Sequence, residues 1–202
     1  DEMRATSAVY DHLWQIEASK LKEAASIMSR DFGFREAVAT SDIATISSAL
    51  SNAKSRLGVD SVYLVLSDGR GIMAGEVEAS PAMPEIYAAL QSRGDESGII
   101  GVNGAAYQSV AEPVRAPNLL GWVLFSNRLG ADQLAELEVL SAIPLKASVE
   151  IGLESGAEVG TRDGIITRDS IIPGFGDLPD ARLILEYPVA GAMAPFQTML
   201  YA

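Results

Sequence analysis

Residues 59–75 constrain the fold of this chain more than any other stretch. The segment reads VDSVYLVLSDGRGIMAG: an apolar, β-branched run leads into Asp68-Gly69, and a shorter apolar run follows. Asp-Gly between two such runs predicts a β-hairpin, because the tight turn needs a positive φ that glycine adopts without steric cost. Residues 59–66 are apolar at nearly every position, which is typical of a strand covered on both faces. We therefore expect this run to form a central strand of a sheet.

Two helical patterns precede the hairpin. Residues 5–32 contain neither proline nor glycine and repeat apolar side chains at helical spacing in two adjacent stripes, one of Val9, Leu13 and Ile16 and one of Tyr10, Trp14, Leu21, Ala25, Met28 and Phe32. Two stripes indicate two burial partners, the body of the domain and a second copy of the helix, although one partner would also account for them. Phe32-Gly33-Phe34 breaks the pattern. Ser41 or Asp42 is expected to cap a second helix that ends at Gly58.

The pattern after the hairpin predicts one more helix and three strands. A helix is expected over residues 85–93, strands over 98–102, 106–114 and 119–126, and a closing helix over 131–140. Asn103-Gly104 between the first two strands is a strong hairpin signal. This order matches the PAS-like fold, a five-stranded antiparallel sheet with a ligand cavity between sheet and helix. The predicted fold class is α+β: a long N-terminal helix, a PAS-like five-stranded antiparallel sheet with flanking helices, then a smaller, reduced second α/β module.

The second module is predicted from a weaker pattern. Strands are expected over residues 144–153 and 181–189, and residues 173–179 are a loop by composition. Asp163-Gly164 before two isoleucines repeats the arrangement at Asp68-Gly69. Residues 187–202 carry no charged side chain, which fits either a buried last strand and helix or the approach to a membrane segment.

Composition and motifs argue against several classes of function. The 202 residues carry a net charge of −12, which repels nucleic acid and anionic lipid. The absence of cysteine excludes thiol catalysis and zinc thiolate sites. The single histidine, His12, lies on the leading helix, and no phosphate-binding loop or acid–base pair is apparent. We expect no enzyme, cofactor, metal site or nucleic-acid partner in this chain.

A small-molecule pocket is the best-supported kind of site. Such sites are mostly apolar concavities with a few polar groups. Tyr63, Tyr107 and Trp122 lie on three predicted strands of one sheet, and Tyr87 lies on the helix expected to cover it. Gln108 and Arg115 are predicted to supply polar contacts at the rim. The alternative is that these aromatic side chains only fill the core.

Several segments resemble the double Cache sensor domains of bacterial membrane receptors. The resemblance rests on DFGFREAVATSD at residues 31–42, the following residues 46–50, and SDGR at residues 67–70. It continues in AEPVRAP at residues 111–117 and GWV at residues 121–123, and it covers roughly residues 20–140. These are fold-level patterns and not catalytic motifs.

The resemblance implies an extracytoplasmic, periplasmic location between two transmembrane helices of an inner-membrane receptor. It implies residues 1–58 as leading helices, 59–140 as a membrane-distal PAS-like module and 141–202 as a reduced membrane-proximal module that leads to the second span. Many such receptors carry a cytoplasmic GGDEF diguanylate cyclase, and others carry a histidine kinase. The expected partners are an unknown small-molecule ligand and a second copy paired through the N-terminal helix. A ligand-free module that only spaces and dimerises the receptor remains an alternative.

Overall fold

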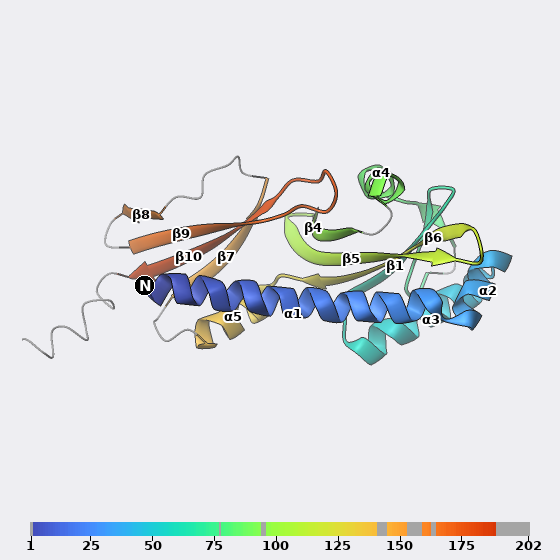
Figure 1. Ribbon diagram of the computed structural model, residues 1–202, viewed down its shortest axis with the longest axis horizontal. Helices are drawn as coiled ribbons and strands as arrows, with labels where there is room; N and C mark the ends of the chain where they lie inside the picture. Colours follow the sequence, from blue (N-terminus) through green and yellow to red (C-terminus); the bar gives the residue numbers. More distant parts are fainter. Residues whose placement is uncertain are drawn as a thin grey trace, which may run out of the picture.

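The computed structural model describes residues 2–76, 78–93, 96–140, 145–152, 159–162 and 165–188. These residues form two antiparallel sheets, and one long helix, α1, runs beside both of them (Figure 1). We call the sheet of strands β1 to β6 the first sheet and that of strands β7 to β10 the second sheet. This arrangement confirms the predicted α+β class.

Three helices lead into the first sheet: α1 (Glu2–Arg30), α2 (Phe32–Thr40) and α3 (Ile43–Leu57). The predicted break at residues 32–34 is wrong. The chain breaks at Asp31, whose side chain accepts a hydrogen bond from the Phe34 backbone at 2.8 Å and starts α2. Asp42 caps α3 by accepting from the Thr45 backbone at 3.2 Å, as predicted. Ser41 instead ends α2 at a φ of 57°.

The first sheet contains the five predicted strands and one more. They are β1 (Ser61–Leu66), β2 (Arg70–Met73), β4 (Glu96–Val102), β5 (Ala105–Arg115) and β6 (Leu119–Arg128), and the additional β3 is the two-residue Ser80–Pro81. The order across the sheet is β3-β2-β1-β6-β5-β4, with every neighbouring pair antiparallel. β1 is therefore an interior strand, as its apolar run predicts.

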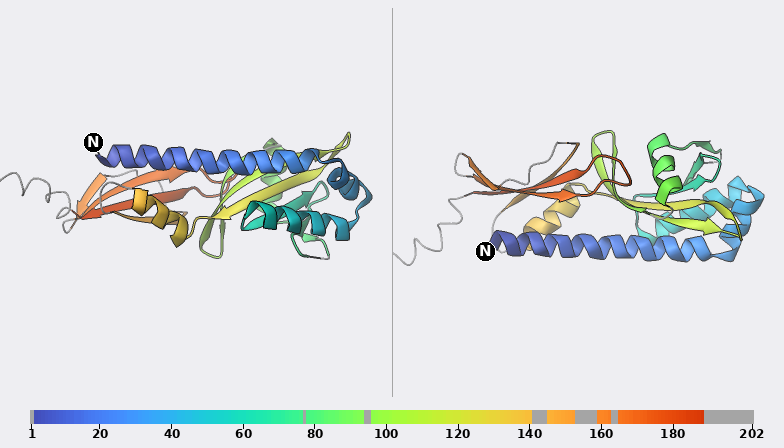
Figure 2. Two further views of the ribbon diagram at one scale, coloured as in Figure 1. Left: turned by 90° about the horizontal axis from the view of Figure 1, so that it is seen from below. Right: turned by 45° about the horizontal axis from the view of Figure 1, so that its top comes forward.

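The two faces of the first sheet meet different helices (Figure 2). On one face, Val62, Val110 and Phe125 form a core with residues of α1 and α3 such as Leu21, Ile46 and Leu50. On the opposite face, α4 (Pro84–Arg93) packs against part of the sheet through Ile86, Ala89 and Leu90. We call the first the helix-covered face and the second the cavity face.

The second sheet is smaller and follows α5 (Ala131–Leu140). Its strands are β7 (Lys146–Ile151), β8 (Val159–Arg162), β9 (Ile165–Ile172) and β10 (Ala181–Pro188), in the order β7-β10-β9-β8. Leu183, Leu185 and Tyr187 of β10 form a core with Leu134 of α5, and Trp14 of α1 packs against it. Asp163-Gly164 and residues 189–202 lie outside the described residues. Tyr187 and Pro188, the first two residues of the uncharged stretch 187–202, are the last two residues of β10.

The residues between β9 and β10, 173–180, join the second sheet to the first. We call them the junction loop. Ile99 of β4 donates a backbone hydrogen bond to Pro173 at 2.9 Å, and Phe175 donates one back to Ile99 at 2.8 Å. At Gly98 the two backbones lie so close that a Cβ would overlap main-chain atoms of Gly174 and Phe175. A Cβ on Gly174 would overlap the backbone of Leu178 and Pro179 within the junction loop itself. Phe175 then enters the core below α4 and is 0% exposed.

Truncation of Phe175 tests how much the junction loop contributes to the stability of the fold. Phe175→Ala is expected to lower the free energy of unfolding by about 3–5 kcal/mol, because it removes a fully buried ring from a packed core. Phe32→Ala is the matched control, since Phe32 is 73% exposed and its loss should cost under about 0.5 kcal/mol. Urea denaturation followed by circular dichroism measures both. Equal effects of the two substitutions would contradict the buried position of Phe175.

Candidate functional site

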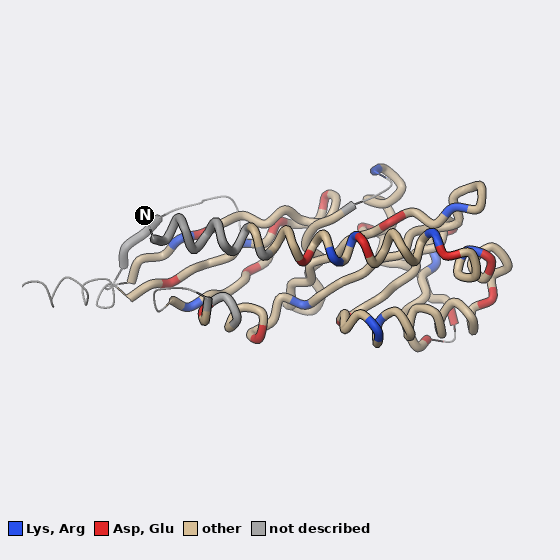
Figure 3. Tube along the Cα trace, turned by 60° about the horizontal axis from the view of Figure 1, so that its bottom comes forward, with Lys and Arg blue, Asp and Glu red and all other residues tan. Residues whose placement is uncertain are grey.

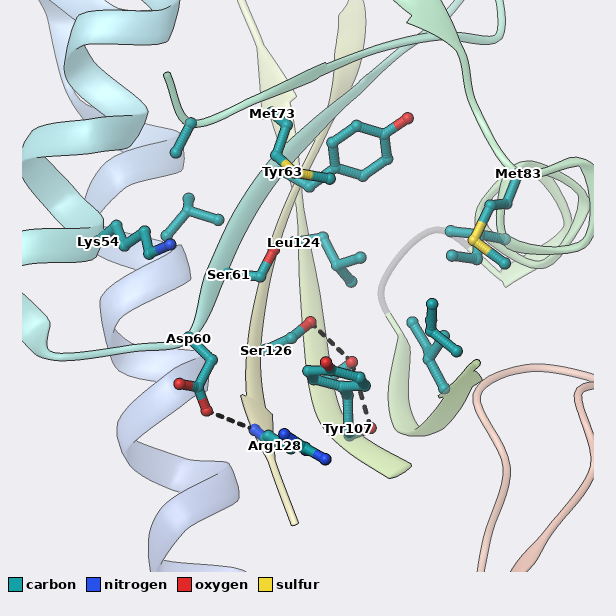
Figure 4. A pocket seen from close by; sticks show the side chains of 16 residues that line it. Lys54, Asp60, Ser61, Tyr63, Met73, Met83, Tyr107, Leu124, Ser126 and Arg128 are labelled. Carbon is teal, nitrogen blue, oxygen red and sulfur yellow. Dashed lines mark hydrogen bonds between the residues drawn. The ribbon is translucent and has the colours of Figure 1, made fainter. Parts of the chain in front are cut away.

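A cavity of about 530 Å³ lies on the cavity face of the first sheet, beside α4 (Figure 4). Its walls come from the end of α3, strands β1, β2, β4, β5 and β6, and the start of α4. The cavity has a polar floor, one charged end and an apolar wall.

A row of small residues hollows the floor. Ser61, Ser126, Ser109 and Gly98 are successive partners on β1, β6, β5 and β4, so their side chains point to the same face. We call the three serines the serine row. The hydroxyls of Ser109 and Ser126 lie 2.8 Å apart and hydrogen-bond each other, and both residues are buried. Larger residues flank the row on both sides, with Tyr63 and Leu124 on one and Tyr107 on the other. The cavity therefore follows from strand register.

The charged end holds Lys54 of α3, Asp60 before β1 and Arg128 at the end of β6. Asp60 fastens the two strands: its carboxylate accepts from the Arg128 backbone at 2.7 Å, and its own backbone donates to the Asn127 side chain at 3.2 Å. These bonds hold the backbone at residues 60 and 128 in place. The Lys54 and Arg128 side chains lie at the cavity beside them.

The apolar wall lies toward α4. It is formed by Met73 of β2, Met83 and Ile86 at α4, Ile100 of β4 and Leu124 of β6. Ile86, Ile100 and Leu124 also belong to the buried cluster that contains Phe175. The apolar wall of the cavity and Phe175 of the junction loop are thus parts of one packed cluster.

Two of the predicted site residues line this cavity. Tyr63 contributes from β1 and Tyr107 from β5. The Tyr63 ring lies across β2, with its hydroxyl directly over Gly71, where a Cβ would overlap it. Burial raises the pKa of Tyr63 above its ordinary value of 10.0, and the negative charge of Glu76 adds to the shift.

The structure places Trp122 and Tyr87 away from this cavity. They share the cavity face but pack on each other edge to face, with ring centroids 6.4 Å apart. Trp122 is buried in the core, and the Tyr87 hydroxyl donates to the Ser67 carbonyl at 2.8 Å. Trp122 thus belongs to the buried cluster below α4, and Tyr87 is partly buried against it.

Gln108 and Arg115 also lie outside the cavity. Gln108 follows Tyr107 on β5, so its side chain points to the helix-covered face, where its amide donates to the Trp14 carbonyl of α1 at 3.0 Å. Arg115 is exposed at the end of β5, and its carbonyl accepts from Arg35 of α2 at 3.4 Å. Both residues connect the sheet to the leading helices.

The sequence predictions missed the serine row and the charged end. Each of β1, β5 and β6 contains one serine, and the sequence does not reveal that these three become neighbours, because this depends on which residues pair across strands. The described residues contain no group of three or more side chains able to hold a metal ion. No helix in the described part of the chain combines the length and apolarity needed to cross a bilayer.

The environment of Tyr63 predicts how stability depends on pH. Folding favours its protonated form, so this contribution is fully present below pH 10.0 and is lost as the pH rises through the higher folded pKa. Glu76→Gln is expected to move the folded pKa of Tyr63 back toward its ordinary value. Absorbance titration at the phenolate band, with Tyr63→Phe subtracted, measures the shift. A Tyr63 pKa below that of a free tyrosine would contradict this environment.

The family model described as the double sensory domain of two-component sensor kinases matches residues 4–149. No curated protein matches the sequence. A solved domain of a sensory box/GGDEF family protein from Vibrio parahaemolyticus has a TM-score of 0.66 at 8% identity, over 93% of this chain and 95% of that one.

Two further solved structures share the fold. The extracellular domain of a histidine kinase has a TM-score of 0.60 at 8% identity, with 93% and 90% of the two chains covered. The ligand-binding domain of the Pseudomonas fluorescens chemoreceptor CtaA, in complex with L-isoleucine, has a TM-score of 0.52 at 15% identity, with 95% and 91% covered. At these identities the likeness concerns the fold.

The family match identifies the functional class of this chain. Domains of this family are sensory modules and not enzymes, which agrees with the expectation for this chain. Because the match spans residues 4–149 of 202, the chain belongs to the double Cache family, the double sensory domains of two-component sensor kinases, and the resemblance found in the sequence is confirmed.

Proposed function

We propose that this chain is the extracytoplasmic, periplasmic ligand-sensing part of a transmembrane receptor, and that a small molecule binds in the cavity beside α4. The observation that supports ligand binding is the cavity itself. Its volume of about 530 Å³ lies within the range of about 300–1,000 Å³ that small-molecule sites occupy. Its apolar wall with a few placed hydroxyls and charges is the composition that such sites share.

The competing proposal is a ligand-free module that only spaces and dimerises the receptor. A cavity face packed solid with aromatic side chains would favour it. Trp122 and Tyr87 do pack in this way at one end of the face. The serine row leaves the other end hollow, and this difference favours ligand binding.

The packing around α4 suggests how binding becomes a signal. Ile86 of α4 lines the cavity, while Ala89 and Arg93 of the same helix meet the junction loop. Arg93 forms an ion pair with Asp177 at 2.9 Å, and Phe175 packs in the same cluster as Ile86. A ligand that contacts the α4 side differently in two states would therefore bias the second sheet. A coupling of about 1–3 kcal/mol suffices for a usable switch.

The arrangement of the two sheets supports an orientation in the receptor. We propose residues 59–140 as the membrane-distal module and 141–202 as the membrane-proximal one, with transmembrane helices flanking both ends. The start of α1 and the end of β10 lie at the same end of the molecule (Figure 1), as two connections to one membrane require.

The output module is a separate part of the proposal. A cytoplasmic diguanylate cyclase of the GGDEF type is proposed first, on the likeness to the Vibrio domain of a GGDEF family protein. A histidine kinase is the second candidate, on the description of the family. Cyclic di-GMP formation and autophosphorylation by the full-length receptor distinguish the two.

Tyr107 provides the test of the cavity. In the full-length receptor, Tyr107→Ala is expected to raise the ligand concentration for half-maximal response at least about tenfold, because it removes an aromatic side chain that lines the cavity. The matched control is Tyr87→Ala, an aromatic truncation outside the cavity, which should keep the ligand affinity of the purified domain while lowering its Tm. A metabolite that raises the Tm of the wild-type domain serves as the ligand. An unchanged response in a folded Tyr107→Ala receptor would place the site elsewhere.

We also propose a parallel homodimer through α1. Ile16 and Ile27 are exposed, Ile27 at 66%, and they lie eleven residues apart, about three helical turns on one face. The opposite face packs on the first sheet through Leu21, Ala25 and Met28. In Figure 3, acidic and basic residues are interspersed along the C-terminal half of α1, so two copies would not oppose regions of one sign. The side chains of Val9 and Leu13 lie outside the described residues.

Cysteine cross-linking tests this dimer in the membrane-bound receptor. Single cysteines at positions 16, 20, 23 and 27 should cross-link to the same position of the second copy, because they recur on the exposed face. Cysteines at positions 19 and 22 are controls on the flank of the helix and should react less. Cross-linking that shows no helical period would contradict a dimer through α1.

A further inference from the structure

The charged end of the cavity indicates the class of ligand, an inference that rests on the proposed function. Lys54, Asp60 and Arg128 are the charged residues among those lining the cavity, and Figure 4 shows them toward one side of it, away from Met83. Two cations and one carboxylate leave a net charge of one positive unit. The whole chain has a net charge of −12, so this local excess of positive charge is opposite to the average surface.

Among the described residues, the two cations have no ion-pair partner, unlike four other basic residues of the protein. Lys20, Arg70, Arg93 and Arg182 each hold a carboxylate at 2.6–2.9 Å. Within the described part of the chain, the side chains of Lys54 and Arg128 form no such ion pair. The Asp60 carboxylate accepts the Arg128 backbone N–H at 2.7 Å, which commits one of its oxygens to holding the strands together. Lys54 and Arg128 therefore keep their donors available to a ligand.

The remaining surfaces divide the cavity by polarity. The serine row crosses the floor from β1 to β5. Ser109 and Ser126 are buried and bond each other, and Ser61, the least buried of the three, offers a hydroxyl that donates or accepts. Ile86, Ile100 and Leu124 form the apolar wall at the α4 side. A molecule with an anionic group at Lys54 and Arg128 and an apolar body along Leu124 would match all three surfaces. A single negative charge balances the local excess.

We propose that the cavity selects a small organic monoanion, a monocarboxylate with an apolar body, over neutral, cationic and zwitterionic molecules of the same size. The carboxylate accepts hydrogen bonds from Lys54 and Arg128, and such charge-assisted bonds are the stronger class. The body lies over the serine row against the wall that includes Ile86. Selection then depends on charge at one end and on apolar contact near α4 at the other.

Four six-carbon probes test this selection on the purified domain: sodium hexanoate, hexanamide, hexylamine and L-norleucine. Hexanoate is expected to give a saturable rise in Tm and a measurable heat of binding, with hexanamide at least about tenfold weaker and hexylamine weaker still. L-Norleucine carries the same carboxylate with an added ammonium and should also bind less tightly. Tighter binding of L-norleucine, hexanamide or hexylamine than of hexanoate would overturn the inference.

Charge-removing variants locate the effect. Lys54→Gln and Arg128→Gln should each weaken hexanoate binding about tenfold and reduce its preference over hexanamide. Arg56→Gln is the matched control, because Arg56 lies on the same helix but lines a groove between α1 and α3 instead of this cavity. It makes the same change in net charge and should leave binding unchanged. Equal losses in all three variants would indicate attraction by overall charge and would overturn the site.

Two cavity-filling variants separate this inference from the proposed function. Ser61→Phe and Val102→Trp both place a large ring in the cavity, and Val102 is on the edge strand, where the ring is better tolerated. In whichever variant keeps the wild-type circular dichroism spectrum, hexanoate binding should be lost. A neutral or cationic ligand that binds the wild type and is lost in these variants would overturn the charge selection and leave the sensor proposal standing. No binding across carboxylates, amides and amines of two to eight carbons would overturn both.

Discussion

The burial of one face of the first sheet is the constraint on which the rest of the structure depends. Val62, Val110 and Phe125 point to that face, and α1 and α3 cover it with Leu21, Ile46 and Leu50. Burying side chains of this size contributes about 1.5–3 kcal/mol each, so the helices cannot shift to the other face without a large loss. The opposite face is then left to α4, a ten-residue helix that covers only part of it. The cavity lies on the part of this face beside α4, where the serine row lowers the floor.

The order and type of the elements are predictable from local patterns. The Asp68-Gly69 and Asn103-Gly104 turns, the apolar run of β1 and the pattern of α5 each carry their signal within a few residues. Asp31 shows the limit of such signals. Asp31 starts a helix by accepting from the Phe34 backbone, and reading Phe32-Gly33-Phe34 as the break put the boundary one to three residues too late.

The site depends on contacts that local patterns do not contain. Tyr107 and Gln108 are neighbours, and strand alternation alone forbids both from facing one cavity. The choice of which one faces it requires knowing the side on which α1 lies. The serine row is harder still, since Ser61 and Ser126 become neighbours only through the pairing of β1 with β6. Trp122 lies on the expected face, but its distance along the strand from the cavity is fixed by the register with β1.

The contact between Gly98 and Gly174 has a consequence for how receptors of this kind diversify. The two backbones meet there through main-chain hydrogen bonds on either side, and Ile99 contributes both its N–H and its carbonyl. Apart from the glycines at positions 98 and 174, these main-chain bonds do not depend on side-chain identity, so the serines and charges of the cavity are free to change without altering this connection. Substitutions in the cavity of the first sheet can therefore change ligand specificity, while the main-chain connection between the first sheet and the junction loop is kept.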